Sequence, residues 1–294
     1  MAADPVQAPA VTAVRALESA REVCRRLAIR HYENFPVGRW GIPAARRPHI
    51  HAVYAFARMA DDFADEPEYE GKRLELLDDW GRRLESCRSA PDHPVFLALG
   101  DTINRLDLPL EPFRDLLSAF RQDAEGRRYE DWDSVLDYCR RSANPIGRLV
   151  LLISGQSAPD RLPLSDSLCT ALQLANFWQD LSVDLPRGRC YLPRRDADAC
   201  SVDLDRLQKG EDVPGAGRLL GLMCERTSAL FDVSRRLPGM LRGRLRIEIA
   251  ATWLGGRTIL KRSAALGERA FKKRPKLGLL DKAAVGLGAL VRGV

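Results

Sequence analysis

The chain has 294 residues, of which 45% are hydrophobic and 29% are charged. This length and composition can build a sizeable hydrophobic core, and they exclude a disordered or collagen-like chain. The N-terminus lacks the basic segment and apolar run of a secretory signal, and no stretch reaches the roughly 18 uninterrupted apolar residues of a membrane-spanning helix. We therefore expect a cytoplasmic globular protein.

Apolar residues recur at three- and four-residue spacing through nearly every segment, whereas the alternating pattern of strands does not occur. The sequence therefore predicts an all-α fold with one helical domain. The expected helices cover residues 11–31, 47–66, 70–88, 93–106, 110–124, 131–154, 160–185, 211–236, 240–267 and 277–291. Within the sixth of these helices, Asn144-Pro145 predicts a kink or a break.

The second expected helix carries an acidic face. Tyr54, Arg58, Asp61, Asp62 and Asp65 fall within about 100° of one another on a helical wheel. Three carboxylates at these positions repel one another, so without a cation the arrangement costs helix stability. A cation, and in particular a metal ion, would offset that cost.

Asp78 and Asp79 give an internal comparison for this motif. Arg82 and Arg83 follow four residues later, so this pair is expected to be a solvated, ion-paired face. Four residues after the aspartate pair of the first motif, the sequence has only further acidic residues. A lone acidic cluster is usually a solvated surface, so the first pair alone leaves both a surface face and a metal site open.

A second polar face lies on the expected helix at 160–185. Gln173, Asn176, Asp180 and Asp184 follow at three- and four-residue steps and span about 80° of the wheel. The run 168–179 contains no charged residue, which indicates an internal helix. Carboxylates on an internal helix need a counter-charge.

Carboxylate and amide oxygens suit magnesium, which keeps several waters and is usually held by one or two carboxylates together with substrate phosphates. Two such faces could clamp a diphosphate through a few ions, and the metal would withdraw charge from the leaving group. Arg58, Arg187 and Arg189 lie within or just after the two helices and could complete the clamp.

A carbocation left by a departing diphosphate survives only in a dry, apolar pocket whose aromatic faces stabilise positive charge. For Phe56 and Trp178, which point away from the two polar faces, the ordinary core is the better interpretation. The candidates for such a lining are Phe35, Tyr54, Phe56, Tyr129, Phe177, Trp178 and Tyr191.

The positive charge is concentrated near the C-terminus: residues 257–294 hold ten Lys and Arg against two Asp and Glu. Lys272, Lys273, Arg274 and Lys276 precede apolar positions of a short helix. This segment is expected to be either a basic amphipathic element on an anionic membrane surface or a solvated surface helix. Because no aromatic residues interleave with these cations, nucleic acid is not an expected partner.

Together these residues resemble the squalene/phytoene synthase family, all-α enzymes with two aspartate-rich magnesium motifs on opposing helices. The likeness runs from about Arg21 to about Lys276. It rests on Tyr54-x3-Arg58-x2-Asp61-Asp62-x2-Asp65, Tyr129, Asn144-Pro145-Ile146-Gly147-Arg148 and Gln173-x2-Asn176-x3-Asp180-x3-Asp184-x2-Arg187-Gly188-Arg189-x-Tyr191-Leu192-Pro193.

The resemblance implies a single-domain isoprenoid-synthase-type helical bundle around a central cavity. We expect a tail with the start of the first helix at 1–20, the helical domain at 21–276 and a basic amphipathic segment at 277–294. The resemblance also implies a set of metal-binding residues and a set of substrate-binding residues. The metal-binding and catalytic set is Asp61, Asp62, Asp65, Asn176, Asp180 and Asp184. The substrate-binding set is Asn34, Phe35, Tyr54, Arg58, Tyr129, Gln173, Arg189 and Tyr191.

Within the family, Tyr32-Glu33-Asn34-Phe35-Pro36-Val37, Asn176-Phe177-Trp178-Gln179-Asp180 and Thr252-Trp253-Leu254-Gly255-Gly256 resemble the hopanoid-pathway branch. By that resemblance, the enzyme uses two or three Mg²⁺ ions to convert presqualene diphosphate and water into hydroxysqualene and diphosphate. No NADPH or flavin is expected. Expected partners are the prenyl diphosphate, other enzymes of squalene biosynthesis and the inner membrane surface.

Three alternatives stay open. Condensing members of the family usually carry a serine-containing motif where this chain has Glu33-Asn34-Phe35, so one preformed diphosphate is favoured over condensation. The condensing alternatives are presqualene diphosphate, squalene and phytoene synthase. A class I terpene cyclase has a similar second motif, and a non-catalytic helical scaffold on the membrane is the alternative from another class.

Overall fold

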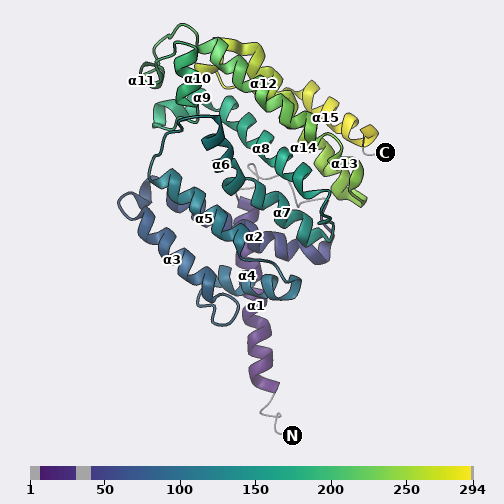
Figure 1. The fold of residues 1–294 in the computed structure, drawn as a ribbon. Helices are drawn as coiled ribbons and strands as arrows, with labels where there is room; N and C mark the ends of the chain where they lie inside the picture. The colour runs from purple at the N-terminus through teal and green to yellow at the C-terminus, as the bar shows by residue number, and fades with distance from the viewer. Residues whose placement is uncertain (1–6, 31–40, 293–294) are drawn as a thin grey trace. The chain divides into compact units, whose positions relative to one another are not determined.

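The computed structural model describes residues 7–30 and 41–292, and within them it contains helices and turns but no strand (Figure 1). The all-α prediction is therefore confirmed. The chain forms two compact units: unit 1 comprises residues 1–124 and 149–155, and unit 2 comprises residues 125–148 and 156–294. In the described residues, no helix has the length and apolar character needed to cross a membrane.

Unit 1 is built around α2, which contacts α1, α3, α4 and α5. Its core centres on Phe56, whose fully buried ring lies against Trp80, Phe96 and Phe113 with centroids 5.4–6.2 Å away. This cluster fixes one face of α2 inside the unit. The helices are α1 (Gln7–Arg30), α2 (Arg47–Asp65), α3 (Arg73–Ser86), α4 (Pro94–Leu106), α5 (Glu111–Ala124) and the last part of α7 (Asn144–Ser154).

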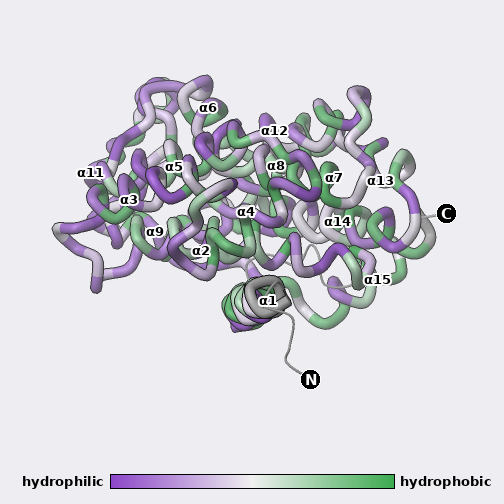
Figure 2. Tube along the Cα trace, turned by 90° about the horizontal axis from the view of Figure 1, so that it is seen from below, coloured by the Kyte–Doolittle hydropathy of each residue, from purple (hydrophilic) through white to green (hydrophobic). Residues whose placement is uncertain are grey.

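Unit 2 is built around α8, which packs against α6, α12 and α14. Trp178 is fully buried there, and its Nε1 donates a hydrogen bond to Thr227 Oγ1 at 2.9 Å. Hydrophobic and hydrophilic residues interleave along the helices (Figure 2), as amphipathic packing requires. The helices are α6 (Trp132–Ser142), the start of α7, α8 (Leu162–Gln179), α9 (Leu181–Asp184), α10 (Arg194–Ala199), α11 (Leu204–Gln208), α12 (Ala216–Ser234), α13 (Leu237–Met240), α14 (Gly243–Leu266) and α15 (Leu279–Arg292).

The break expected at Asn144-Pro145 is present, because α6 ends at Ser142 and α7 begins at Asn144. Gly147 then lets α7 approach α8 closely. A Cβ atom at this glycine would lie 2.5 Å from Cys169 Sγ and 2.6 Å from Ser165 Oγ. The glycine in the Asn-Pro-Ile-Gly-Arg motif is therefore required for packing.

One expectation about the helices was wrong, and two short helices were not predicted. The helix predicted at 160–185 is interrupted at Asp180, whose backbone leaves the helical region with φ −100° and ψ 9°. The short helices α10 and α11 were not predicted, because elements of five or six residues are too short to show a hydrophobic period. The domain boundaries near residues 21 and 276 stay predictions.

Candidate active site

The first acidic face lies at the C-terminal end of α2, where Arg58 supplies the missing cation. Its Nη1 is 3.1 Å from Asp61 Oδ2, and its Nη2 is 2.5 Å from Asp62 Oδ1 and 3.7 Å from Glu66 Oε1. The Arg58 side chain is only 17% exposed, against 37% for Asp61 and 22% for Asp62. The guanidinium of Arg58, which comes from the preceding turn of the helix, therefore forms ion pairs with three carboxylates.

The position of these carboxylates on α2 increases their demand for a cation. Asp61, Asp62 and Asp65 all lie in the last turns of the helix, where the macrodipole is negative and disfavours further negative charge. Tyr54 lies one turn before Arg58, and burial raises the pKa of its hydroxyl, which the nearby Arg58 partly opposes. Tyr54 therefore stays a neutral hydrogen-bonding group at neutral pH.

Asp78 and Asp79, the comparison pair, form ion pairs with nearby arginines, as expected for surface residues. Asp79 pairs with Arg83 at 2.6 Å and with Arg82 at 3.0 Å. Asp78 pairs with Arg121 of α5 instead of with the arginines that follow it in sequence. The pair is therefore ion-paired within unit 1, and the cations come from two helices.

The second acidic motif keeps its register across the helix break. The backbone N–H of Asp180 donates to Asn176 O at 2.9 Å, and the N–H of Asp184 donates to Asp180 O at 2.8 Å. Four-residue steps therefore link the three residues although α8 ends at Gln179. Asn176 is exposed, while Gln173, Asp180 and Asp184 are half-buried. This motif, like the first, lies at the negative end of a helix dipole.

Arg274 binds the central carboxylate of the second motif. Its Nη2 lies 3.1 Å from Asp180 Oδ2, and its Nε donates to Asp180 Oδ1, so the contact is bidentate. Next to it, Gln179 Nε2 donates to Pro275 O at 2.9 Å. The segment that contains Arg274 therefore lies against the end of α8. The sequence placed this arginine only in the basic tail, because no local pattern connects residues 94 positions apart.

Four aromatic rings gather beside the second motif. Phe177 and Tyr191 stack with centroids 3.7 Å apart and planes at 4°. Tyr129 and Tyr138 each lie less than 6 Å from Tyr191, and Tyr138 also lies 6.0 Å from Phe177. Tyr138 was not among the predicted lining residues. Phe56 and Trp178 are fully buried in the cores of their units, as predicted.

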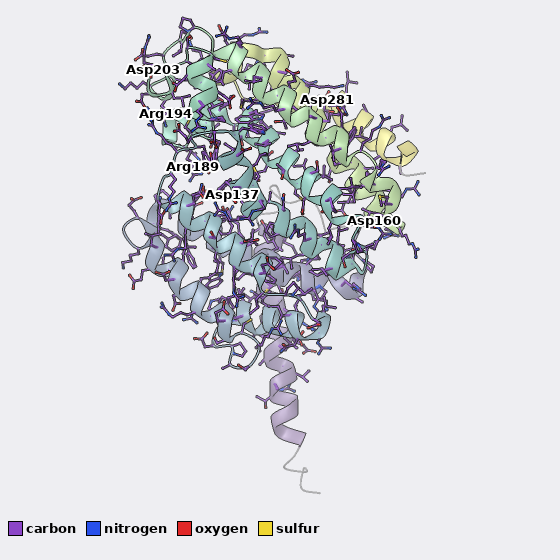
Figure 3. All side chains as sticks on the ribbon, viewed as in Figure 1. Asp137, Asp160, Arg189, Arg194, Asp203 and Asp281 are labelled. Carbon is purple, nitrogen blue, oxygen red and sulfur yellow. The ribbon has the colours of Figure 1, made fainter. Side chains whose placement is uncertain are left out.

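The remaining predicted residues divide between described and undescribed segments. Arg189, labelled in Figure 3, follows the left-handed Gly188, and its backbone N–H donates to Asp184 O at 3.0 Å. Arg187 is exposed. Asn34 and Phe35 lie outside the described residues.

Each motif offers oxygen donors at a place where the helix dipole and neighbouring charges call for a cation, and each already binds an arginine. This donor set fits magnesium. Within the described segments, no group of three or more Asp, Glu, His or Cys side chains lies close enough together to hold a metal ion by itself. Magnesium in phosphate-binding sites is compatible with that, because it takes few carboxylates and completes its shell with water and phosphate.

The chain matches the family model described as squalene/phytoene synthase over residues 29–281. The chain belongs to the squalene/phytoene synthase family. Among its relatives is a protein named hydroxysqualene synthase from Sinorhizobium fredii, which is 35% identical over 229 residues and aligned over 76% of each chain. A phytoene synthase from Mycobacterium tuberculosis is 30% identical over 285 residues, covering 95% of this chain and 93% of the relative.

Among solved structures, the squalene synthase HpnC from Alicyclobacillus acidocaldarius is similar to this chain. It has a TM-score of 0.79 and 41% sequence identity, with 87% of this chain and 95% of that chain covered. The comparison confirms the fold class and supports the resemblance found in the sequence.

Proposed function

We propose that this chain is a magnesium-dependent enzyme that converts presqualene diphosphate and water into hydroxysqualene and diphosphate through a carbocation. The relative from Sinorhizobium fredii that is named hydroxysqualene synthase supports this activity, as does the absence of the serine-containing condensing motif at Glu33-Asn34-Phe35. The observation that carries the proposal is the pair of carboxylate motifs, each at the C-terminal end of a helix and each bound to an arginine.

In this proposal Asp61, Asp62 and Asp65 hold magnesium on one side, and a second set of residues holds it on the other. The bound ions, two or three in number, supply Lewis-acid stabilisation of the charge on the departing diphosphate. The second set is Asn176, Asp180 and Asp184.

The chain's own cations and hydroxyls would position the diphosphate. Arg58 offers a guanidinium that is already held beside the first motif. Arg189 and Tyr191 follow the second motif and would bind phosphate oxygens, and Gln173 is a polar neighbour one turn before Asn176. Tyr54 would donate its hydroxyl at the first motif.

The hydrocarbon part of the substrate needs an apolar lining from which water is excluded. The stacked rings of Phe177 and Tyr191, with Tyr129 beside them, offer aromatic faces that stabilise a carbocation and exclude water until capture. Asn34 and Phe35 complete the proposed substrate-binding set.

The test is the substitution of one carboxylate in each motif. We expect Asp61→Asn and Asp180→Asn each to abolish diphosphate release while circular dichroism shows the parental helix content. Asp79→Asn is the matched control, because its carboxylate is ion-paired outside both motifs, and it should retain turnover. Full activity of either motif variant would remove the proposed clamp.

A condensing activity is the second candidate, because the phytoene synthase of Mycobacterium tuberculosis aligns with nearly the whole chain. That candidate keeps the carboxylate motifs and changes the substrate to two separate prenyl diphosphates. For location, we propose the cytoplasm with peripheral contact at the inner membrane surface, where other enzymes of squalene biosynthesis would be partners.

A further inference from the structure

Helix α15 exposes a stripe of leucines. Leu279, Leu280, Leu287 and Leu290 are 86%, 87%, 67% and 54% exposed. At 100° per residue they fall within about 100° of one another on the helix. Exposed leucines gathered on one face, rather than scattered singly, indicate an interaction surface.

The opposite face of α15 is the packed one. The helix contacts α14, and Ala289 on this side is fully buried. Val285 and Gly288 on the same side are half-buried. The uncharged Ala283 and Gly286 lie among the exposed leucines. The leucine stripe therefore takes no part in the packing of α15 within unit 2.

A basic pocket of about 810 Å³ lies directly before this helix in the chain. Six of its nine lining residues are cationic and none is acidic. Arg262 pairs with Asp281, Lys272 pairs with Asp212, and Arg274 pairs with Asp180. The lining residues are Arg262, Ala265, Leu266, Arg269, Lys272, Lys273, Arg274, Pro275 and Lys276.

The other three cations of the lining are not neutralised. Arg269, Lys273 and Lys276 form no ion pair with any residue in the described part of the chain. Lys273 and Lys276 are also exposed. The pocket therefore offers positive charge to an anion from outside the chain.

Asp281 connects a lining residue of the pocket to the first turn of α15. Its Oδ2 accepts a hydrogen bond from the backbone N–H of Gly278 at 2.6 Å and lies 2.5 Å from Nη2 of Arg262, which lines the pocket. These contacts lower the pKa of the Asp281 carboxyl, so it stays ionised. Asp281, labelled in Figure 3, lies in the first turn of α15 and holds the start of this helix against Arg262. Leu279 follows Lys276, the last lining residue of the pocket, by only three positions, so the first exposed leucines lie close to the pocket along the chain.

We propose that the basic pocket and the leucine stripe together dock the chain on a membrane that contains anionic lipids. Lipid phosphates would enter the pocket near Lys273 and Lys276, while Leu279, Leu280 and Leu287 enter the boundary between headgroups and acyl chains. This docking surface would make the peripheral membrane contact that was proposed above, and the inference rests on that part of the proposed function.

Charge complementarity favours a lipid surface over a second copy of this chain. In a symmetric contact between two copies, each partner presents the same patch to the other. The basic pockets would then face each other and repel. An anionic bilayer instead supplies negative charge beside an apolar layer, which matches both parts of the surface.

The test is co-sedimentation of the full chain with vesicles of phosphatidylglycerol and phosphatidylcholine, compared with pure phosphatidylcholine. We expect binding to the anionic vesicles that weakens with salt. Replacing Lys273 and Lys276 with glutamate should lower the affinity roughly fivefold or more for each lysine. Leu279→Ser with Leu280→Ser should lower it roughly tenfold or more for each leucine.

Matched controls come from exposed residues elsewhere. Lys72→Glu with Lys209→Glu makes the same change in net charge, and Val233→Ser removes an apolar side chain that is 56% exposed. Both controls should bind vesicles as the parent does. Since the substituted side chains are exposed, circular dichroism should show the parental helix content in every variant.

Equal vesicle binding by the parent and both surface variants would overturn the proposal. So would self-association that the leucine variant abolishes, together with no vesicle binding by the parent, because the stripe would then be a contact between copies. Turnover of detergent-dispersed presqualene diphosphate, measured separately, reports on the catalytic proposal alone. Either proposal can therefore fail without the other.

Discussion

Replacing Arg58 with methionine tests whether the first acidic motif needs a cation. The substitution keeps an unbranched side chain and removes the guanidinium that lies 2.5 Å from Asp62 and 3.1 Å from Asp61. The side chain of Asp62 is 22% exposed and would lose the cation of its ion pair. In a half-buried position such a loss costs about 1.5–3 kcal/mol, and the more exposed Asp61 adds little to it.

Magnesium should reduce the deficit in free energy of unfolding of the Arg58→Met variant relative to the parent. Without the guanidinium the carboxylates are uncompensated, so the variant should bind magnesium more tightly than the parent does. A ligand that binds only the folded state stabilises it by about 1.4 kcal/mol at roughly tenfold its dissociation constant. We therefore expect the deficit in free energy of unfolding to be largest in EDTA and to narrow by about 1 kcal/mol in magnesium.

The assay is urea denaturation followed by circular dichroism, in EDTA and in millimolar magnesium. Arg83→Met is the matched control: Arg83 also pairs with two carboxylates at 2.6 Å, but these are 40% and 61% exposed. Its deficit should stay below about 1 kcal/mol and should not depend on magnesium. An Arg58→Met deficit that is the same in both buffers would refute the reasoning.

Three further predictions concern the core, pH and the second motif. Phe56→Ala should lower the free energy of unfolding by about 3–5 kcal/mol in urea titrations, and a loss below about 1 kcal/mol would contradict the central place of this ring. Burial lowers the pKa of His49 and His51, so in acid below about pH 6.5 the unfolded chain binds protons that the folded chain does not. Stability should therefore fall as pH decreases through that window, and urea midpoints that rise there would contradict this sign. Arg274→Ala should change stability by less than about 1 kcal/mol, because the pair with Asp180 is partly exposed, yet it should raise magnesium affinity a few-fold in calorimetry. Unchanged affinity would argue against Asp180 as a metal ligand.

Local periodicity was sufficient to predict the faces of α2 and α8. A helix repeats every 3.6 residues, so the spacing of Asp61, Asp62 and Asp65 already places them on one side. The same reasoning assigned Phe56 and Trp178 to the core, and their full burial confirms it. These features depend on one helix at a time.

Features that depend on distant residues could not be predicted in this way. The contact of Arg274 with Asp180 joins positions 94 residues apart, and hydrophobic spacing carries no signal for it. Tyr138 joins the ring cluster through its contact with Tyr191, which lies in another segment. The helix break at Asp180 was also missed, because the wheel pattern continues through it and the four-residue hydrogen bonds preserve the spacing.

The central claim is that this chain releases diphosphate from presqualene diphosphate in a magnesium-dependent reaction. The direct measurement is incubation of the pure protein with farnesyl, geranylgeranyl and presqualene diphosphates separately, with magnesium or with EDTA, followed by product analysis. We expect that presqualene diphosphate alone is consumed, only with magnesium, and that the product is an alcohol. Product formed from farnesyl or geranylgeranyl diphosphate alone, or turnover that persists in EDTA, would contradict it.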